Sequence, residues 1–320
     1  MALVQAGRVS LKSMTFRLKP WPAAVLVVLS CAAIVGALWY LRSVAPLDRA
    51  AMLRRLPANA SVVAFADLEA LRKAGLLELV DSSTAVEEAE YRSFVTATGF
   101  DYRLDLDHLY IAKANEQTYA VVTGRFNWAS LSSYVASQNG ICRFAFCRVP
   151  ASETGKRVSF LPIRRNTMGF AAGSDEWAAL HLSENDQGPP AAAPASAPVW
   201  FWFSKRALTE ESLPDRLREL LAPVAGSERV TIALEPDGGR LVLHATVVAA
   251  SADAARRIEQ HLSAIGSKLR QEMMTARTPV DSSTLSGVLV SGKVEVAGDQ
   301  VDGRWPVERA FLENLIGGKI

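Results

Sequence analysis

Hydrophobic residues divide the chain into one long apolar block near its start and many short segments after it. The block spans 23–41 and carries no charged side chain, with Trp21 just before it and Trp39 and Tyr40 near its end. As an α-helix, these 19 residues would rise about 29 Å, enough to cross the hydrocarbon core of a bilayer. Tryptophan and tyrosine favour the two membrane interfaces. The pattern therefore predicts a transmembrane helix over 23–41.

Two processing alternatives remain open for this block. The VGA sequence ending at Ala37 suits signal peptidase, and the VLSC sequence ending at Cys31 resembles a lipoprotein signal. We favour a retained anchor, because ten apolar residues follow Cys31. The tail at 1–22 carries four cations and no acid, which favours a cytoplasmic N-terminus. We therefore expect a single-pass protein of the bacterial inner membrane with an extracytoplasmic domain.

Strand and helix patterns then occur twice in the order strand, helix, hairpin, helix, hairpin, helix. A polar connector at 42–60 leads into the first series, and a Pro/Ala-rich linker or loop at 185–198 precedes the second. The first series predicts strands at 61–66, 109–113, 118–125, 157–163 and 167–172, an extended stretch at 141–148, and helices at 68–80, 85–98, 127–137 and from Ser174. The second predicts strands at 199–203, 229–234, 240–248, 293–297 and 301–304, and helices at 214–221, 253–274 and from Pro306.

Hairpins dominate both series, and hairpins join antiparallel strands. An antiparallel sheet commonly packs one face on its helices. We therefore predict an α+β fold with two similar lobes, at 61–184 and 199–317, each an antiparallel sheet with helices on one face.

Charge and composition exclude several functional classes. The net charge is +2, but without the four cations of the tail the chain holds 31 basic and 33 acidic residues. That balance is not the one of a generally basic nucleic-acid binder. Three cysteines and four scattered histidines are too few for a disulfide scaffold or a dedicated metal protein. We expect no metal, no cofactor and no nucleic-acid partner.

The segment 287–293, GVLVSGK, matches the glycine and lysine spacing of a phosphate-binding loop. Val294 stands where that loop needs Ser or Thr for magnesium, and the preceding residues do not form an apolar strand. The ordinary alternative is the end of a helix followed by a strand, and we expect no nucleotide. The sequence also contains no G-x-S-x-G, S-x-x-K or H-E-x-x-H motif of the common hydrolases.

The densest polar cluster is at 101–108, DYRLDLDH. Asp105 and Asp107 would share one face of a strand, and His108 beside them could serve as a base. A calcium loop counted from Asp105 lacks a glycine at its sixth position. Turn acids paired with Arg103 are the commoner explanation, which we favour over a catalytic site.

Cys142 and Cys147 bracket four residues. In a straight strand they would lie about 16 Å apart, and a disulfide needs Cα atoms within about 7 Å. A disulfide therefore requires this segment to bulge or turn. Both the disulfide and two buried thiols remain open, with the disulfide slightly favoured in an oxidising compartment.

The strand at 199–203, VWFWF, is bulky on both faces. Trp200 and Trp202 share one face because strand residues alternate. An open face would make them a platform for a peptide, glycan or lipid. We favour a buried position, with helices that include 253–274 covering the two rings, because strands that are apolar on both faces are usually central.

The phrase LPANASVVA at 56–64, followed by LRKAGL at 71–76, resembles the start of bacterial single-span, envelope-anchored proteins of unknown function. Those proteins open with a Leu-Pro-Ala phrase and repeat α+β hairpin units, but the family implies no activity and no site residues. We therefore expect a non-enzymatic, membrane-anchored protein of binding, scaffold or envelope-assembly type. It would bind a protein partner or associate with itself. The alternative is an envelope hydrolase with a dispersed site at Asp105, Asp107 and His108.

Overall fold

The computed structural model describes residues 47–77, 89–151, 154–184, 188–191, 197–209, 221–237, 240–277 and 279–316. All of them fall within the unit Pro46–Ile320. The predicted membrane helix at 23–41, its processing sites and most of the predicted helix at 214–221 lie outside the described residues. Within the described ranges, no helix is both long enough and apolar enough to cross a membrane.

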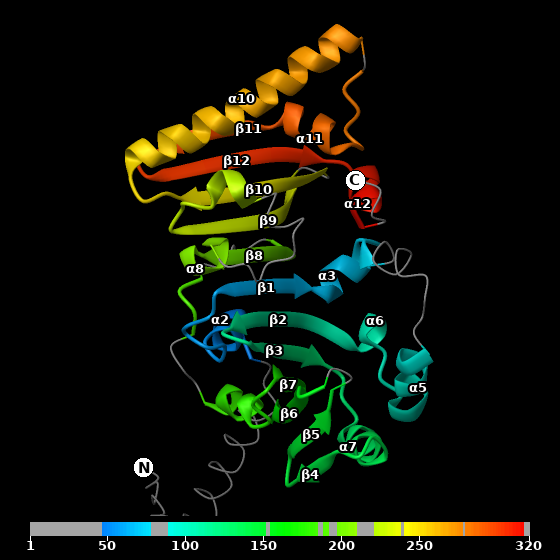
Figure 1. Ribbon diagram of the computed structural model, residues 1–320. Coiled ribbons are helices and arrows are strands. Elements are labelled where there is room, and N and C mark those ends of the chain that lie inside the picture. Colours follow the sequence, from blue (N-terminus) through cyan, green and yellow to red (C-terminus); the bar gives the residue numbers. More distant parts are fainter. Residues whose placement is uncertain are drawn as a thin grey trace, which may run out of the picture. The chain divides into compact units, whose positions relative to one another are not determined.

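Twelve strands form one sheet in the order β11-β12-β10-β9-β8-β1-β2-β3-β7-β6-β5-β4 (Figure 1). Every neighbouring pair is antiparallel. The strands are β1 (Val62–Asp67), β2 (Leu106–Ala114), β3 (Gln117–Gly124), β4 (Ile141–Arg143), β5 (Phe146–Pro150), β6 (Arg157–Arg164), β7 (Thr167–Gly173), β8 (Val199–Ser204), β9 (Arg229–Asp237), β10 (Arg240–Val248), β11 (Lys293–Ala297) and β12 (Gln300–Val307). The fold is α+β with a large antiparallel sheet, as the hairpin signals predict.

Helices connect these strands and begin at capping side chains. They are α2 (Arg49–Leu53), α3 (Leu68–Lys73), α5 (Ala89–Thr98), α6 (Tyr102–Asp105), α7 (Trp128–Ser137), η1 (Ala178–Ser183), α8 (Lys205–Thr209), η2 (Ala222–Val224), α10 (Ala252–Ala276), α11 (Leu285–Ser291) and α12 (Arg309–Ile316). Asp48, Asp67, Asn127, Ser251 and Thr284 each accept a hydrogen bond from a backbone N–H in the first turn of the next helix. These bonds satisfy N–H groups that have no partner within the helix.

The sheet has two halves that meet at the β1–β8 pair. On one side the strand order is β1-β2-β3-β7-β6, continued by β5 and β4. On the other side it is β8-β9-β10-β12-β11. Residues 62–66 pair with 199–203 across the junction, so one hydrogen-bonded sheet runs through both predicted lobes. We call the two sides the N-terminal half and the C-terminal half.

Directly paired residues of neighbouring strands point to the same face of a sheet. One row of such partners crosses ten strands: Lys293, Arg304, His244, Ala233, Trp200, Phe65, Tyr110, Val121, Gly169 and Leu161. We call the face that carries this row face A. The opposite face, face B, carries Phe203 with its partners Val62 and Val230.

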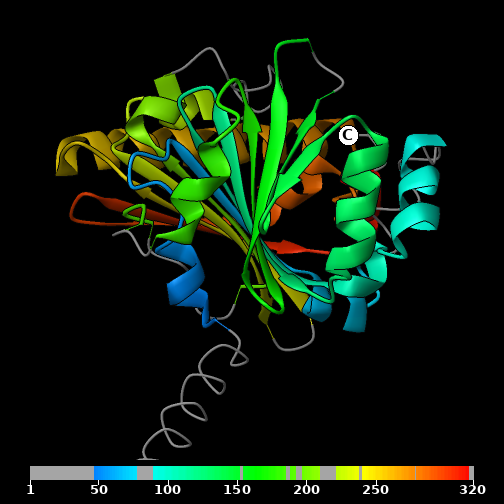
Figure 2. The same ribbon diagram turned by 90° about the horizontal axis from the view of Figure 1, so that it is seen from below.

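Helices cover face B in both halves of the sheet. In the N-terminal half, Leu131 of α7 belongs to a buried cluster with Val122 of β3. In the C-terminal half, Ala255 of α10 belongs to a cluster with Phe203, and Phe311 of α12 packs with Val307 of β12. Figure 2 shows α2 on the other side of the strands from α5 and α7.

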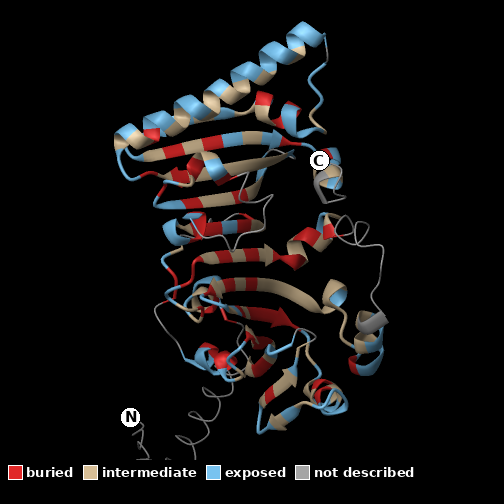
Figure 3. Ribbon diagram, in the orientation of Figure 1, coloured by how far each residue is buried: buried red, intermediate tan, exposed pale blue. Residues whose placement is uncertain are grey.

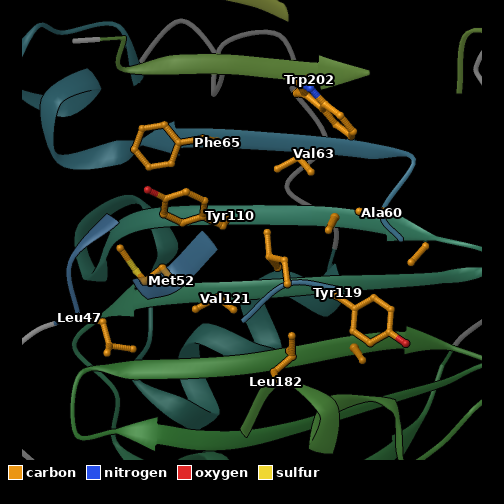
Figure 4. Packing of buried hydrophobic residues seen from close by; sticks show 14 of the residues in the cluster. Leu47, Met52, Ala60, Val63, Phe65, Tyr110, Tyr119, Val121, Leu182 and Trp202 are labelled. Carbon is orange, nitrogen blue, oxygen red and sulfur yellow. The ribbon is translucent and has the colours of Figure 1, made fainter. Parts of the chain in front are cut away.

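In the N-terminal half, face A is covered as well, by α2, η1 and the described part of the Pro/Ala-rich segment. Met52, Leu182 and Ala197 form one buried cluster with Phe65 and other residues of face A (Figure 4). The expectation of helices on one face only is therefore wrong. Residues 47–60 are also more than a connector, because Met52 and Leu56 are 1% and 0% exposed.

The expectation that the helix at 253–274 covers Trp200 and Trp202 is wrong. Ala255 of α10 lies in the face-B cluster of Phe203, whereas both tryptophans lie in the face-A cluster. Trp200 and Trp202 are only 1% and 3% exposed; they belong to the buried cluster that includes Met52 of α2 and Leu182 of η1, and the ring centroid of Trp200 lies 5.9 Å from that of Phe65. Neither ring lies open as a surface platform.

Two local elements differ from the sequence pattern because turns interrupt them. The helix expected at 68–80 ends as α3 at Lys73, and Gly75 follows with φ +65, a conformation that favours glycine. The stretch expected to be extended at 141–148 is the β4–β5 hairpin, whose tip holds Phe144 at φ +55.

Candidate functional site

A hollow of about 850 Å³ lies on face A of the C-terminal half, over β9, β10, β12 and β11. Its lining includes Glu235, Asp237, His244, Lys293, Glu295, Asp302 and Arg304, with Pro236, Val242, Ser291 and Pro306 between them. Four of these residues are acids and two are bases, so the lining is net acidic when the histidine is neutral. We call this site the His244 hollow.

Alternation along the last two strands makes this face polar. On β12, Asp302 and Arg304 point to face A, while the buried Val301 and Gly303 point to face B. Lys293 of β11 faces Arg304 in the same way. Figure 3 shows β3 buried at most of its positions, whereas β12 alternates buried and accessible residues. The charged positions give a helix no apolar stripe to pack against.

His244 lies between two carboxylates at the floor of the hollow. Its Nδ1 is 3.8 Å from Oε1 of Glu235, and its Nε2 is 3.4 Å from Oδ1 of Asp302. The Nε2 atom is buried without a hydrogen-bond partner among the described residues. A buried polar atom without a partner costs free energy.

Asp302 is held in place by two side chains on face A. Its Oδ1 accepts a hydrogen bond from Thr246 Oγ1 at 2.8 Å, and its Oδ2 accepts one from Gln300 Nε2 at 2.8 Å. The side chain is 31% exposed, so the carboxylate remains open to a ligand. A fixed, accessible carboxylate suits the binding of a cationic or hydrogen-bond-donating group.

The described residues offer no metal centre. No group of three or more His, Cys, Asp or Glu side chains is placed to hold an ion within the described ranges. The acids beside His244 approach its two different ring nitrogens and do not converge on one point. His181 and His261 lie exposed on η1 and α10.

The structure divides the acid cluster at 101–108. Asp105 closes α6, where its carboxylate accepts hydrogen bonds from Arg125 at 3.1 Å and from the backbone N–H of Asp101 at 2.9 Å. Asp107 lies in β2, at a register shift between Leu106 and His108. Asp105 thus pairs with Arg125, whereas the ordinary interpretation expected Arg103 as the partner of these acids.

His108 has other partners, on face A. Its Nδ1 lies 2.9 Å from Thr123 Oγ1, and its Nε2 lies 3.7 Å from Oδ2 of Asp67. The same Asp67 oxygen accepts a hydrogen bond from Arg49 at 2.7 Å, and its other oxygen caps α3 through the N–H of Ala70. This network ties α2 and α3 to the sheet, so the structure assigns His108 and Asp105 to separate contacts.

Cys142 and Cys147 face each other across the β4–β5 hairpin. They form a disulfide with their Cα atoms 4.1 Å apart. The turn at Phe144 makes this approach possible, because it reverses the chain between the two cysteines.

The GVLVSGK segment is the end of a helix followed by a strand. Ser291 ends α11, Gly292 is its C-cap, and Lys293 opens β11. A phosphate-binding loop has the reverse order, a strand followed by a helix. Lys293 instead contributes its charge to the His244 hollow.

Sequence reasoning missed the His244 hollow, since His244 counted only as one of four scattered histidines. The available signal was the alternation of charged and apolar residues over 293–304, which is typical of a strand pair with one open face. The pairing of β12 with β10, and of β10 with β9, brings these residues next to His244 and Glu235. The local sequence pattern does not contain this information.

Comparison with known proteins identifies no family for this chain. No family model matches it, and no curated protein matches it. Crystal form III of TP0453 is similar in structure, with a TM-score of 0.49, 10% sequence identity and coverage of 85% of this chain and 99% of that chain. Crystal forms I and IV of TP0453 have TM-scores of 0.47 and 0.46, identities of 10% and 12%, and cover 86% and 83% of this chain and 98% and 96% of theirs. No function follows from similarity at this level.

Proposed function

We propose that this chain is a membrane-anchored extracytoplasmic protein that binds a protein partner in the bacterial envelope and catalyses no reaction. The apolar block at 23–41 supplies its single inner-membrane span, and the cationic tail at 1–22 stays in the cytoplasm. The Cys142–Cys147 disulfide supports an oxidising compartment for the domain.

The observation that carries the binding role is the His244 hollow. A sheet face that does not pack on the protein's own core must present groups that water or a partner satisfies. Here Glu235, His244 and Asp302 together line about 850 Å³ of open space. The hollow thus combines fixed charges with room for a side chain or a short segment.

The charge of the hollow favours a basic partner segment. Glu235 and Asp302 flank the centre, and four acids line the hollow against two bases. An incoming arginine can form two parallel hydrogen bonds with one carboxylate. The same acidic lining repels the phosphates of nucleic acids and nucleotides.

We further propose that the two halves are copies of one duplicated unit. The order β1-β2-β3-β7-β6 has its counterpart in β8-β9-β10-β12-β11, which supports this proposal. In such a pair, the N-terminal copy keeps face A for stability and the C-terminal copy uses face A for recognition.

Site-specific crosslinking in native membranes tests the binding role. A photoreactive residue replaces the exposed Glu295 of the hollow, or as a control Lys268 on α10, whose side chain is 79% exposed. We expect adducts from position 295 and none from 268. An adduct of twice the chain mass would show that the chain binds a second copy of itself and not a different protein.

Charge removal sharpens the same experiment. Combining Glu235→Gln with Asp302→Asn should reduce the adduct yield at least tenfold while membrane fractionation stays the same. Equal adduct yields at positions 295 and 268, or a yield at 295 that the two substitutions leave unchanged, would refute the hollow as the binding surface.

The proposed orientation has its own test. Protease added to spheroplasts should digest the domain from outside, and complete protection of the domain would refute the proposed orientation.

A further inference from the structure

A second, apolar cavity lies on face B of the N-terminal half. Its volume is about 220 Å³. Phe94 of α5 and Tyr134 of α7 lie on its helical side, with their ring centroids 5.1 Å apart. Val122, Phe160 and Phe170 from β3, β6 and β7 form its sheet side. It is separate from the His244 hollow, which lies on the other face of the other half.

The chemistry of the lining excludes bound water. Among the described residues, the side chains that line the cavity all come from Phe, Leu, Val, Tyr or Met, and the hydroxyl of Tyr134 is their only oxygen or nitrogen. A stable buried water needs two to four polar partners. An apolar cavity without such partners stays dry and is a site for apolar molecules.

The cavity sits where a well-packed core would otherwise be. Val122, Leu131 and Phe160 are buried, at 4%, 6% and 6% exposed, and the ring of Phe160 lies against that of Phe170, tilted by 37° with the centroids 5.5 Å apart. Protein interiors normally leave few voids larger than a water molecule. A space of this size among packed aromatic rings is therefore a candidate binding volume.

We propose that this cavity binds an uncharged apolar group of about nine non-hydrogen atoms, an alkyl chain or an aryl ring. The size follows by proportion, because an apolar cavity of about 150 Å³ holds benzene. This inference goes beyond the proposed function, since it concerns another site and another class of ligand.

The test observes the methyl groups of methionine by NMR in the full chain held in lipid nanodiscs. Met168 lines the cavity, whereas Met274 is 75% exposed on α10 and serves as the internal control. Propylbenzene and 1-octanol, each with about nine non-hydrogen atoms, are the aryl and alkyl probes. We expect a saturable shift of the Met168 signal with little change at Met274, and the tighter probe assigns the class of the ligand.

Matched substitutions separate the cavity from other binding. Val122→Phe fills the cavity and should weaken probe binding at least tenfold, whereas Val242→Phe in the His244 hollow should leave it unchanged. If Val122→Phe fails to fold, Leu131→Ala should enlarge the cavity and move the optimum to probes larger than propylbenzene. A Met168 signal that does not move, or that moves in step with Met274 without saturation, would overturn the proposal and leave the His244 hollow unaffected.

Discussion

The two halves of the sheet differ in what lies on face A. In the N-terminal half the row of paired residues from Phe65 to Leu161 is buried under α2, η1 and their neighbours. In the C-terminal half the same row stays buried at Trp200 and Ala233, and it then lines an open hollow at His244, Arg304 and Lys293. One row of paired positions therefore serves as core along most of its length and as surface at one end.

This difference shows that the side chains, and not the strand order, decide whether a face of the sheet is buried or open. The strand order β8-β9-β10-β12-β11 repeats that of β1-β2-β3-β7-β6, so the backbone offers both halves the same platform. Side chains at alternate positions then decide whether another layer can pack. Apolar residues on face A gain free energy when α2 covers them, whereas charged residues lose hydration under a cover.

The largest contrast should come from large-to-small substitutions along the row. Trp200→Ala should lower the free energy of unfolding by about 4 kcal/mol, because it removes a buried ring and leaves a cavity. His244→Ala, on the open part of the row, should change it by about 0.5 kcal/mol or less. Urea unfolding of the full chain measures both, and equal losses would contradict the distinction between the buried and the open parts of the row.

Removal of the cover itself should have the next largest effect. Met52 of α2 is 1% exposed, so Met52→Ala should cost about 3 kcal/mol. The exposed Met274, at 75%, is the matched control, and Met274→Ala should cost about 0.5 kcal/mol or less. A Met52→Ala variant as stable as the control would mean that α2 does not cover face A.

The disulfide should have an intermediate and local effect. Its cysteines are five positions apart, and a loop this short stabilises the fold by about 2 kcal/mol. The double variant Cys142→Ser with Cys147→Ser should lose about that amount and exchange its β4–β5 amide hydrogens faster. Reductant should destabilise the native chain and leave the double variant unchanged, while insensitivity of both would show that the bond contributes nothing.

Alanine substitutions at two glycines should differ by a smaller amount in their cost to the free energy of unfolding, because only one of the two glycines has a close neighbour. Gly188 and Gly155 both have positive φ, +69 and +80, but a Cβ at 188 would lie 2.7 Å from Cα of Arg54, whereas a Cβ at 155 would meet nothing within 4 Å. Gly188→Ala should therefore cost about 1 kcal/mol more than Gly155→Ala. Thermal unfolding of the two variants measures the difference, and equal costs would argue against close packing of this loop on α2.

The smallest change in stability should accompany the largest change in binding. Asp302→Asn keeps an acceptor for Thr246 and removes one charge from the His244 hollow. We expect the free energy of unfolding to change by about 0.5 kcal/mol or less, while the crosslinking yield from position 295 falls several-fold. A large loss of stability would place Asp302 in the core of the C-terminal half instead.

Local patterns in the sequence predicted much of the fold but not its layers. The cap at Asn127, the strand at 240–248 and the helix at 253–274 follow from capping and periodicity, and the structure has them as α7, β10 and α10. Periodicity identifies the apolar side of an element and does not identify its partner. Hence the sequence predicted that Trp200 is buried, but not that α2 rather than α10 covers its face.

The sequence by itself determined most of the strands, the longest described helix, the antiparallel pairing of the hairpins and the apolar block at 23–41. Tertiary structure alone decided that both series share one sheet, that residues 47–60 belong to the core, and that Glu235, His244 and Asp302 meet. These outcomes depend on contacts between residues far apart in the chain. Their formation reflects the balance between apolar burial and charge hydration over whole faces of the sheet, which no short window of sequence contains.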